Sequence, residues 1–490
     1  MSAPRSYDAI VIGGGTSGLI ASTYLGKAGK RVLLLEAQDR FGGRCAPANL
    51  GDGFSAARGA QMLYALDPLV MRELKLARKG LRFEGRELAL TGLRSDGKHI
   101  VIRRDVHDTA SSIAVHSASD ADAWPHFRKE LFDLARVMRG LWWEHRGALP
   151  SGAAKQKLGC IARMGAAAWL DSWFESEALK ATLCFDATDG GLSVLEPGSA
   201  LSLVWRATQE MSGLQGAAAV PLGGLAALFD VLAWAAKEVG CELRTGTRVQ
   251  NILLDAGQVA GVQIESGETC FAPVVFSAIS RLQTLSKLLP DGALGIARQT
   301  AAAGQPSSLA EAGVLFTLRG APSFDGVAVP AGNRFILADR PEIYVSAEMA
   351  ARAGKLGDEL PIAFTIPTLS DPSLAPPDQH ILSALIRPVP RHPVDTWYVL
   401  KADLAARVAG AMERLAPGLS RAISNIEILS PDDTDDGYPI TVSHMLSSAV
   451  ARVETSVAGL FLCGADAEPV PAISGRAARI AGALAAAGRR

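Results

Sequence analysis

Residues 8–18, Asp-Ala-Ile-Val-Ile-Gly-Gly-Gly-Thr-Ser-Gly, decide the fold of this chain. The short β-branched run at residues 8–12 predicts a strand, and the apolar residues 19–28 behind the glycines predict a helix. A strand that enters a helix through a glycine turn is typical of α/β proteins that bind nucleotides. The stretch therefore predicts an α/β fold with a nucleotide site close to its amino end.

The glycine turn gives each of its small residues a separate role. Gly13 allows the tight turn, Gly15 lets the backbone approach a pyrophosphate, and Gly18 permits close packing of the helix on the strand. The start of the helix adds backbone NH groups and the positive end of the helix dipole. The residues predicted to hold the phosphates are therefore Gly13, Gly15, Thr16, Ser17 and Gly18.

A second strand is predicted at residues 31–35, and it ends in Glu36, eighteen residues after Gly18. An acidic side chain at this distance accepts hydrogen bonds from both ribose hydroxyls and repels a 2'-phosphate. The strand, the glycine turn, the helix and the acid together predict that the chain binds a dinucleotide.

The residues after the second strand indicate which dinucleotide. Residues 36–44, Glu-Ala-Gln-Asp-Arg-Phe-Gly-Gly-Arg, resemble the ExxxRxGGR segment of the flavoprotein family of monoamine oxidases and phytoene desaturases. The resemblance implies that the cofactor is FAD. Paired glycines let a second loop lie against a cofactor, and arginines beside it neutralise pyrophosphate oxygens. We therefore expect Arg40, Gly43 and Arg44 at the cofactor, the alternative being an ordinary glycine turn with solvated arginines.

The loop at residues 53–62 resembles the family's loop that runs under the flavin. The resemblance places Gln61 and Met62 at the cofactor. Ala57 stands where the family has an acid, and Ala60 stands where it has a proline. The position of the loop is thus predicted, whereas its side-chain contacts differ from those of the family.

The middle of the chain returns to a cofactor-binding pattern. Residues 220–224 resemble the PxGG segment of phytoene desaturases, and we expect a helix at residues 225–239 and a strand at residues 241–249. By resemblance, Val249 contacts the adenine through its backbone. The turn at residues 255–257 predicts a β-hairpin.

The C-terminal segment resembles the closing flavin motif of the family. A strand delivers Gly464 and Asp466, and the resemblance implies that Asp466 forms a hydrogen bond near the junction of ribityl and pyrophosphate. The following helix start, near Ile473 and Ser474, is expected to face the flavin pyrimidine. A helix N-terminus stabilises negative charge that develops on the flavin during reduction. In place of the family's glycine-rich loop, this chain has Val-Pro-Ala.

A narrower resemblance is to the bacterial phytoene-desaturase-like group, which also includes pyridine nucleotide-disulfide oxidoreductase domain-containing protein 2. Residues 113–124 and 186–200 support this narrower match, together with the PxGG-like segment. The resemblance therefore covers both ends and the middle of the chain.

The order of these segments predicts two domains in an α/β fold. A Rossmann-type FAD-binding domain is expected to assemble from discontinuous segments, residues 1–91, 214–280 and 436–490. The inserted residues, 92–213 and 281–435, are expected to form an α+β substrate-binding domain. Helical patterns in the first insert lie at residues 122–139, 166–174 and 199–211.

The composition excludes several classes of protein. The chain has 490 residues, 49 Lys or Arg and 50 Asp or Glu, so its net charge of -1 argues against nucleic acid as a partner. Its apolar stretches fall short of the roughly 18 residues that span a bilayer, and residues 1–6 lack the apolar core of a secretory signal. We expect a cytoplasmic protein, with peripheral contact to a membrane left open. The six cysteines lack metal-binding spacing and are expected to be buried thiols.

Alternative functions leave different marks in the sequence. A disulfide reductase needs two close cysteines beside the flavin, and Cys45 has no partner nearby in the sequence. Monoamine oxidases have a tyrosine in the closing flavin segment, yet residues 464–490 contain no Tyr, Trp or Phe. A flavin-folded interaction protein with little turnover stays open as an alternative, because two of the cofactor loops depart from the family.

The leading hypothesis is an FAD-dependent dehydrogenase or desaturase that takes a hydride from an apolar or amphipathic small molecule. Because no second GxGxxG is present for a nicotinamide nucleotide, oxygen or a quinone is expected to accept the electrons. His444, twenty residues before Gly464, is the first candidate for the proton acceptor, and Asp120, Asp186 and Asp189 are weaker candidates. Five tryptophans are expected either to line a substrate channel or to pack between helices: Trp142, Trp143, Trp169, Trp173 and Trp205.

Overall fold

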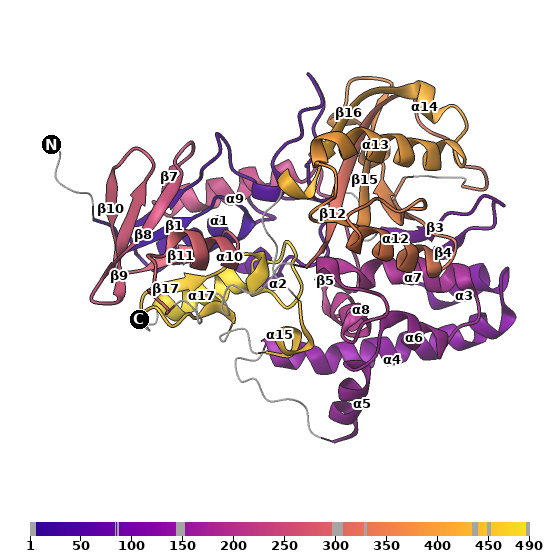
Figure 1. Ribbon diagram of the computed structural model, residues 1–490, viewed down its shortest axis with the longest axis horizontal. Coiled ribbons are helices and arrows are strands. Elements are labelled where there is room, and N and C mark those ends of the chain that lie inside the picture. Colours follow the sequence, from indigo (N-terminus) through magenta and orange to yellow (C-terminus); the bar gives the residue numbers. More distant parts are fainter. Residues whose placement is uncertain are drawn as a thin grey trace.

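Two large sheets lie at opposite ends of the molecule (Figure 1). The computed structural model describes residues 6–83, 85, 88–143, 152–295, 307–327, 331–433, 440–447 and 452–486. A parallel sheet and a small antiparallel sheet form one end, and a mixed sheet with a layer of helices forms the other. Long loops from the N- and C-terminal segments run between the two ends.

The parallel sheet contains the predicted nucleotide-binding unit. Its strand order is β17-β11-β1-β2-β7, and every neighbouring pair is parallel. The strands β1 and β2 are buried at every position, which is why their sequences are continuous apolar runs. The helix α1 (Thr16–Lys27) packs against both α9 (Ala226–Glu238) and α17 (Arg476–Ala486). The strands are β1 (Ala9–Ile12), β2 (Val32–Leu35), β7 (Glu242–Arg244), β11 (Val275–Ser277) and β17 (Leu460–Leu462).

A three-stranded antiparallel sheet follows β7. Its strands are β8 (Val249–Asp255), β9 (Gln258–Ile264) and β10 (Thr269–Phe271), and the predicted hairpin turn between the first two is confirmed. The single strand predicted at residues 241–249 is wrong. The chain breaks after β7 because β7 belongs to the parallel sheet and β8 begins another one, with Gly246 at φ +60° in the turn between them.

The other large sheet has seven strands in the order β16-β12-β15-β14-β13-β3-β4. The long antiparallel pair of β12 and β15 forms its centre, and α12 (Glu342–Arg352) packs against β15. A second helix, α13 (Trp397–Glu413), lies against β16. The strands are β3 (Ala89–Gly92), β4 (Ile100–Ile102), β12 (Leu309–Arg319), β13 (Asn333–Leu337), β14 (Ile362–Thr365), β15 (Gln379–Pro390) and β16 (Ile423–Leu429).

The first insert is mainly helical, and its helices share one apolar core. The predicted helix at residues 199–211 ends earlier than expected, at Thr208, because a short strand, β5 (Glu210–Met211), follows and pairs with β6 (Leu214–Gln215). The helices are α3 (Val106–Ala114), α4 (Ala118–Trp143), α5 (Ala153–Ile161), α6 (Ala166–Asp171), α7 (Glu177–Ala187) and α8 (Ser199–Thr208).

The expected α/β fold with a Rossmann-type unit and a second α+β part is confirmed. The strands of the parallel sheet come from all three segments predicted for the FAD-binding domain. The strand β3 spans the predicted boundary at residue 91 and pairs with β13 of the seven-stranded sheet. The domain limits themselves stay a prediction. No helix in the described ranges is long and apolar enough to cross a membrane.

Candidate active site

The glycine turn between β1 and α1 leaves an open space at the start of the helix. Gly13 has a φ of +96°, and a Cβ on Gly18 would collide with the carbonyl oxygen of Gly13. By contrast, a Cβ on Gly15 would meet only the Cα of Gly43, at 4.0 Å. Gly15 is also the N-cap of α1, so the cap supplies no side-chain acceptor for the first NH groups. These NH groups are therefore suited to hold a phosphate.

A second glycine loop lies directly against the first. The NH of Gly42 donates to the carbonyl oxygen of Gly14 at 3.1 Å, and Gly43, with φ +56°, lies beside Gly15. The two loops thus form one backbone surface. The Arg40 side chain is exposed and pairs with Asp39 at 3.3 Å, so a pyrophosphate would have to compete for it. The side chain of Arg44 lies outside the described residues.

The carboxylate of Glu36 fastens the glycine turn. It is buried at the end of β2, and it accepts hydrogen bonds from the NH of Gly14 at 2.6 Å and of Gln38 at 2.8 Å. A carboxylate has room for about four hydrogen bonds, so these contacts leave capacity for ribose hydroxyls. The backbone of Glu36 also accepts the NH of Thr247, which brings the start of β8 and Val249 close to this acid.

The loop after Phe54 connects the two ends of the molecule. The amide of Gln61 is buried and donates to the carbonyl oxygen of Ala363 in β14 at 3.0 Å. Met62 is buried beside it, and Leu63 exchanges two backbone hydrogen bonds of 2.8 Å with Ala219. The loop therefore runs between the seven-stranded sheet and the PxGG-like segment, where the sequence places the flavin.

The closing segment reaches the same region from the C-terminal side. A Cβ on Gly464 would lie 2.8 Å from the carbonyl oxygen of Ile279, so the chain passes close to the loop behind β11. The Asp466 carboxylate accepts the NH of Arg281 in that loop. Cys463, one residue before Gly464, is fully buried, and burial raises the pKa of its thiol. Cys463 is therefore poorly suited to form a covalent link to a cofactor.

The start of α17 is held by buried polar groups. The carbonyl oxygen of Ser474 accepts the NH of Asp67 at 2.9 Å, and Ile473 packs on the core of the parallel-sheet half. The Asp67 carboxylate is fully buried and accepts from Arg479 of α17 at 3.0 Å. The helix start predicted to face the flavin thus has a fixed position relative to α2 (Pro68–Glu73), which Asp67 caps.

His444 lies beside the closing segment. It belongs to the short helix α15 (Val442–Leu446), and its Nε2 lies 2.7 Å from the carbonyl oxygen of Glu468. Since a carbonyl oxygen only accepts, Nε2 carries the proton and Nδ1 is the basic atom of the neutral ring. Burial lowers the pKa of His444 to about 4. The structure thus places a neutral imidazole next to the predicted flavin segment.

A buried cluster of charges lies between the helices and the seven-stranded sheet, and sequence reasoning identified only two of its members. Arg334 donates to Asp186 at 2.6 Å, and Arg387 pairs with Asp189. Burial raises the pKa of Asp186, but the charges of Arg334 and Arg206 outweigh burial and lower it overall. We call this set the arginine cluster: Tyr64, Asp186, Asp189, Arg206, Glu311, Arg334 and Arg387.

The arginine cluster adjoins the predicted flavin segments. The guanidinium of Arg206 lies 4.4 Å from the ring centroid of Tyr64, three residues after Gln61. A Cβ on Gly190 would collide with Ile440 and would lie 3.5 Å from the ring of Pro471 in the closing segment. The members of the cluster come from α7, α8, β12, β13 and β15, from the turn after α7 and from the loop after Gln61, so no local pattern could have revealed it.

The remaining candidates have structural roles. Asp120 is buried and accepts the NH groups of Glu175 and Ser176, at 2.8 and 2.7 Å, as a cap residue does. Trp169 packs against Phe127 within the helical core. Trp205 is also fully buried, with its ring edge-on to Tyr64.

The other candidates are three tryptophans and the cysteines. Trp173 lies partly buried on the helical core, and the side chains of Trp142 and Trp143 lie outside the described residues. The expectation of buried thiols holds for five cysteines, whereas Cys160 is exposed.

Comparisons with known proteins show the family of this chain. The family described as flavin containing amine oxidoreductase matches residues 16–387. Pyridine nucleotide-disulfide oxidoreductase domain-containing protein 2 of Rattus norvegicus is 27% identical, over 96% of this chain and 92% of the relative. The neurosporene-forming phytoene desaturase of Cereibacter sphaeroides is 26% identical, over 96% of this chain and 93% of the relative.

Solved structures share the fold. Putrescine oxidase bound to putrescine superposes with a TM-score of 0.65 at 17% identity, covering 99% of this chain and 98% of the other. The expected resemblance to flavoproteins of the amine oxidase and phytoene desaturase type is therefore confirmed. The chain belongs to the family of flavin containing amine oxidoreductases and is an FAD-dependent oxidoreductase.

Proposed function

We propose that this protein dehydrogenates an apolar or amphipathic small molecule by hydride transfer to FAD, and that oxygen or a quinone takes up the electrons. The observation that carries the substrate class is the setting of the closing segment. Val470 and Ala472 pack on the apolar core of the helices, and Pro471 lies beside Gly190, whose neighbour in the chain, Asp189, belongs to the arginine cluster. A substrate there would meet an apolar surface with charged groups beside it.

The residues around the glycine turn fit FAD. The open space at Gly15 and the NH groups of α1 would hold the pyrophosphate, and Glu36 would accept the ribose hydroxyls. Asp466 and the helix start at Ser474 would lie along the rest of the cofactor. When bound, FAD supplies a two-electron oxidant for a C–H bond.

The side chains of the protein would orient the substrate and accept a proton. The substrate loses two electrons with one hydrogen as a hydride, and the second hydrogen leaves as a proton. His444 is our candidate for that proton, which its Nδ1 would accept while Nε2 stays hydrogen-bonded to Glu468. Tyr64 and Trp205 would limit the approach of water from the helical side.

An amine is the alternative substrate. The family description and the fold of putrescine oxidase support it, whereas the lack of aromatic residues at positions 464–490 argues against the arrangement used by monoamine oxidases. A substrate panel therefore needs an amine and a neutral compound with the same carbon skeleton.

The test is anaerobic mixing of the FAD-loaded protein with such a panel, read as bleaching of the flavin absorbance. We expect an apolar or amphipathic compound to bleach the flavin and air to restore the colour. NADH and NADPH should bleach it more slowly than about one per second, the lower end of ordinary turnover. Fast bleaching by NADPH without substrate would instead support a reductase.

The His444→Gln variant separates binding from proton transfer. It should retain FAD and slow the bleaching by about 10²- to 10⁴-fold, the usual contribution of a general base. Ser443→Ala, one residue away on an exposed position of α15, is the matched control and should bleach like the unaltered protein. Equal rates for all three proteins would remove His444 from the mechanism. If light reduces the flavin and air reoxidises it, but no compound of the panel bleaches it, the alternative of a flavin-folded interaction protein with little turnover is favoured.

A further inference from the structure

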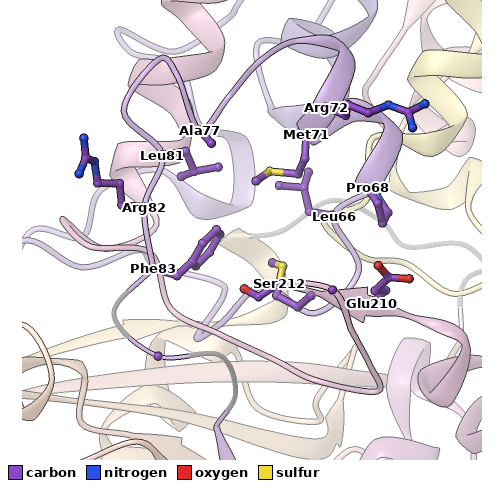
Figure 2. Close-up of a pocket in the computed structure, with 13 residues that line it drawn as sticks. Leu66, Pro68, Met71, Arg72, Ala77, Leu81, Arg82, Phe83, Glu210 and Ser212 are labelled. Atoms are coloured by element: carbon purple, nitrogen blue, oxygen red, sulfur yellow. The ribbon is translucent and has the colours of Figure 1, made fainter.

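A pocket of about 760 Å³ opens beside α2 (Figure 2). It is bordered by α2, by residues 77–83 with Gly85, and by the turn between β5 and β6. None of the residues predicted to contact FAD lines it. Its volume falls within the roughly 300–1,000 Å³ typical of sites for one small ligand.

The interior of this pocket is apolar. Met71 and Leu66 enter from one side and Phe83 from another, and Figure 2 shows these side chains directed toward one another. The apolar lining includes Leu66, Pro68, Met71, Ala77, Leu81, Phe83 and Met211. Figure 2 also shows Arg72 and Arg82 at opposite margins, with their guanidinium groups directed outward. The two guanidinium groups therefore lie at the margins of the pocket and do not enter it.

The chain segment that borders the pocket is strongly basic. Residues 72–82 contain five cations and one acid, although the whole chain has a net charge of -1. The acid, Glu73, accepts a hydrogen bond from the hydroxyl of Tyr24 at 2.7 Å. Glu210, the acid on the opposite wall, is paired with Arg139 at 2.7 Å. Lys79 of this segment is paired with Glu238, and Arg72 lies 4.0 Å from Glu73. Among the described residues that line the pocket, Arg72 and Arg82 are the cations and Glu210 is the acid, so the described rim carries a small excess of positive charge.

We propose that this pocket binds a single-chain amphiphile with an anionic head, of the long-chain carboxylate class. The alkyl chain would replace water against Leu66, Met71 and Phe83, and the head would stay at the rim on the side of either Arg72 or Arg82. The pocket adjoins the flavin region through the chain itself, since Leu66 precedes Asp67, which holds the start of α17. This site is distinct from the proposed reaction centre and goes beyond the proposed function.

The test measures direct binding to the FAD-loaded protein by equilibrium dialysis, without using activity. Octanoate, decanoate and dodecanoate should bind with affinities that rise about threefold to fourfold for each added methylene until the pocket is full. At equal chain length, decanoate should bind more tightly than decan-1-ol, and decylamine should bind most weakly. Equal affinities for decanoate and decylamine would overturn the proposal.

Exposed residues of the rim provide variants that spare the core. The double substitution Arg72→Gln and Arg82→Gln should weaken decanoate binding by about threefold to tenfold and leave decan-1-ol within about twofold. Ala77→Phe, at an exposed lining position, should fill the pocket and weaken both ligands by more than about tenfold. Arg319→Gln, which removes an exposed charge at the end of β12, is the control and should change neither affinity.

Two outcomes would place the binding elsewhere. If Ala77→Phe binds decanoate as tightly as the unaltered protein, the amphiphile occupies another cavity, and the proposal is wrong. If anionic phospholipid vesicles bind to the protein but monomeric carboxylates do not, the basic segment is a membrane-contacting surface and not the rim of a ligand pocket. As a control, the FAD content and thermal unfolding of each variant are compared with those of the unaltered protein, so that a loss of binding is not mistaken for a loss of fold.

Discussion

The glycine turns near the N-terminus and the arginine cluster bring buried polar groups together in opposite ways. In the turns, the polar groups are backbone NH groups and one carboxylate from residues 13–43, and their positions follow from local chain geometry. In the arginine cluster, charged side chains from α7 and the turn after it, α8, β12, β13 and β15 meet only after the helical insert has packed on the seven-stranded sheet. The first region is therefore expected to govern cofactor binding, and the second is expected to govern stability and the shape of the substrate site.

The largest effects should come from two glycines of the same turn. Gly18→Ala should destabilise the protein by more than about 4 kcal/mol, because its Cβ collides with the Gly13 carbonyl oxygen. Gly15→Leu should abolish FAD retention while the free energy of unfolding of the apoprotein changes by about 1 kcal/mol or less, because its side chain enters the open space. Urea unfolding and flavin absorbance measure the two properties. Full FAD content in Gly15→Leu would show that the cofactor lies elsewhere.

A substitution that breaks the arginine cluster should lower the free energy of unfolding and leave FAD binding unchanged. Arg334→Met leaves the buried Asp186 carboxylate with Arg206 at 3.7 Å, and removing one partner of a buried pair costs about 3–5 kcal/mol. FAD content at low temperature should stay unchanged. The double variant Arg334→Met, Asp186→Leu should recover part of the lost free energy in urea unfolding. If Arg334→Met loses FAD without losing stability, the division of roles between the two regions is wrong.

Glu36 should show a smaller effect that is confined to the cofactor. Glu36→Ala removes the acceptor of Gly14 NH and the predicted ribose contacts, so we expect FAD binding to weaken by roughly 1.5–3 kcal/mol. Glu36→Gln keeps the size of the side chain and one acceptor oxygen. Its affinity for FAD should therefore lie between those of the unaltered protein and Glu36→Ala. Fluorescence titration of the apoprotein with FAD gives the dissociation constants. Unchanged affinity in both variants would show that the ribose is bound by other groups.

The smallest predicted effect is a pH dependence from His444. Its pKa of about 4 in the folded protein lies below the unperturbed value of about 6.5. As pH falls, the unfolded chain therefore binds a proton at His444 before the folded protein does. The free energy of unfolding is thus unaffected by protonation of His444 above about pH 6.5 and decreases as pH falls toward 4. After allowance for the partial exposure of the ring, the loss should be on the order of 1–2 kcal/mol. Urea unfolding of His444→Gln should show a flatter profile in this window, and an identical profile would contradict the burial argument.

Local sequence was sufficient for the parts of the site that depend on backbone conformation. The strand, the turn and the helix at residues 9–27 could be predicted because the glycine positions and the apolar runs have one compatible geometry. The same reasoning failed at residues 241–249, where one apolar run is divided between two sheets. The division depends on which strands lie beside the run, and neighbouring residues do not encode that.

The α/β class, the glycine turns, the acid at Glu36 and the order of the cofactor segments could be predicted from the sequence alone, because each motif is recognised from a short run of neighbouring residues. The tertiary structure alone decided that Tyr64, Arg206, Arg334 and Arg387 meet beside the closing segment, and that an apolar pocket with a basic rim opens beside α2. The physical reason is that charged and apolar side chains are placed by the packing of distant elements. A backbone turn is specified by the few residues that form it.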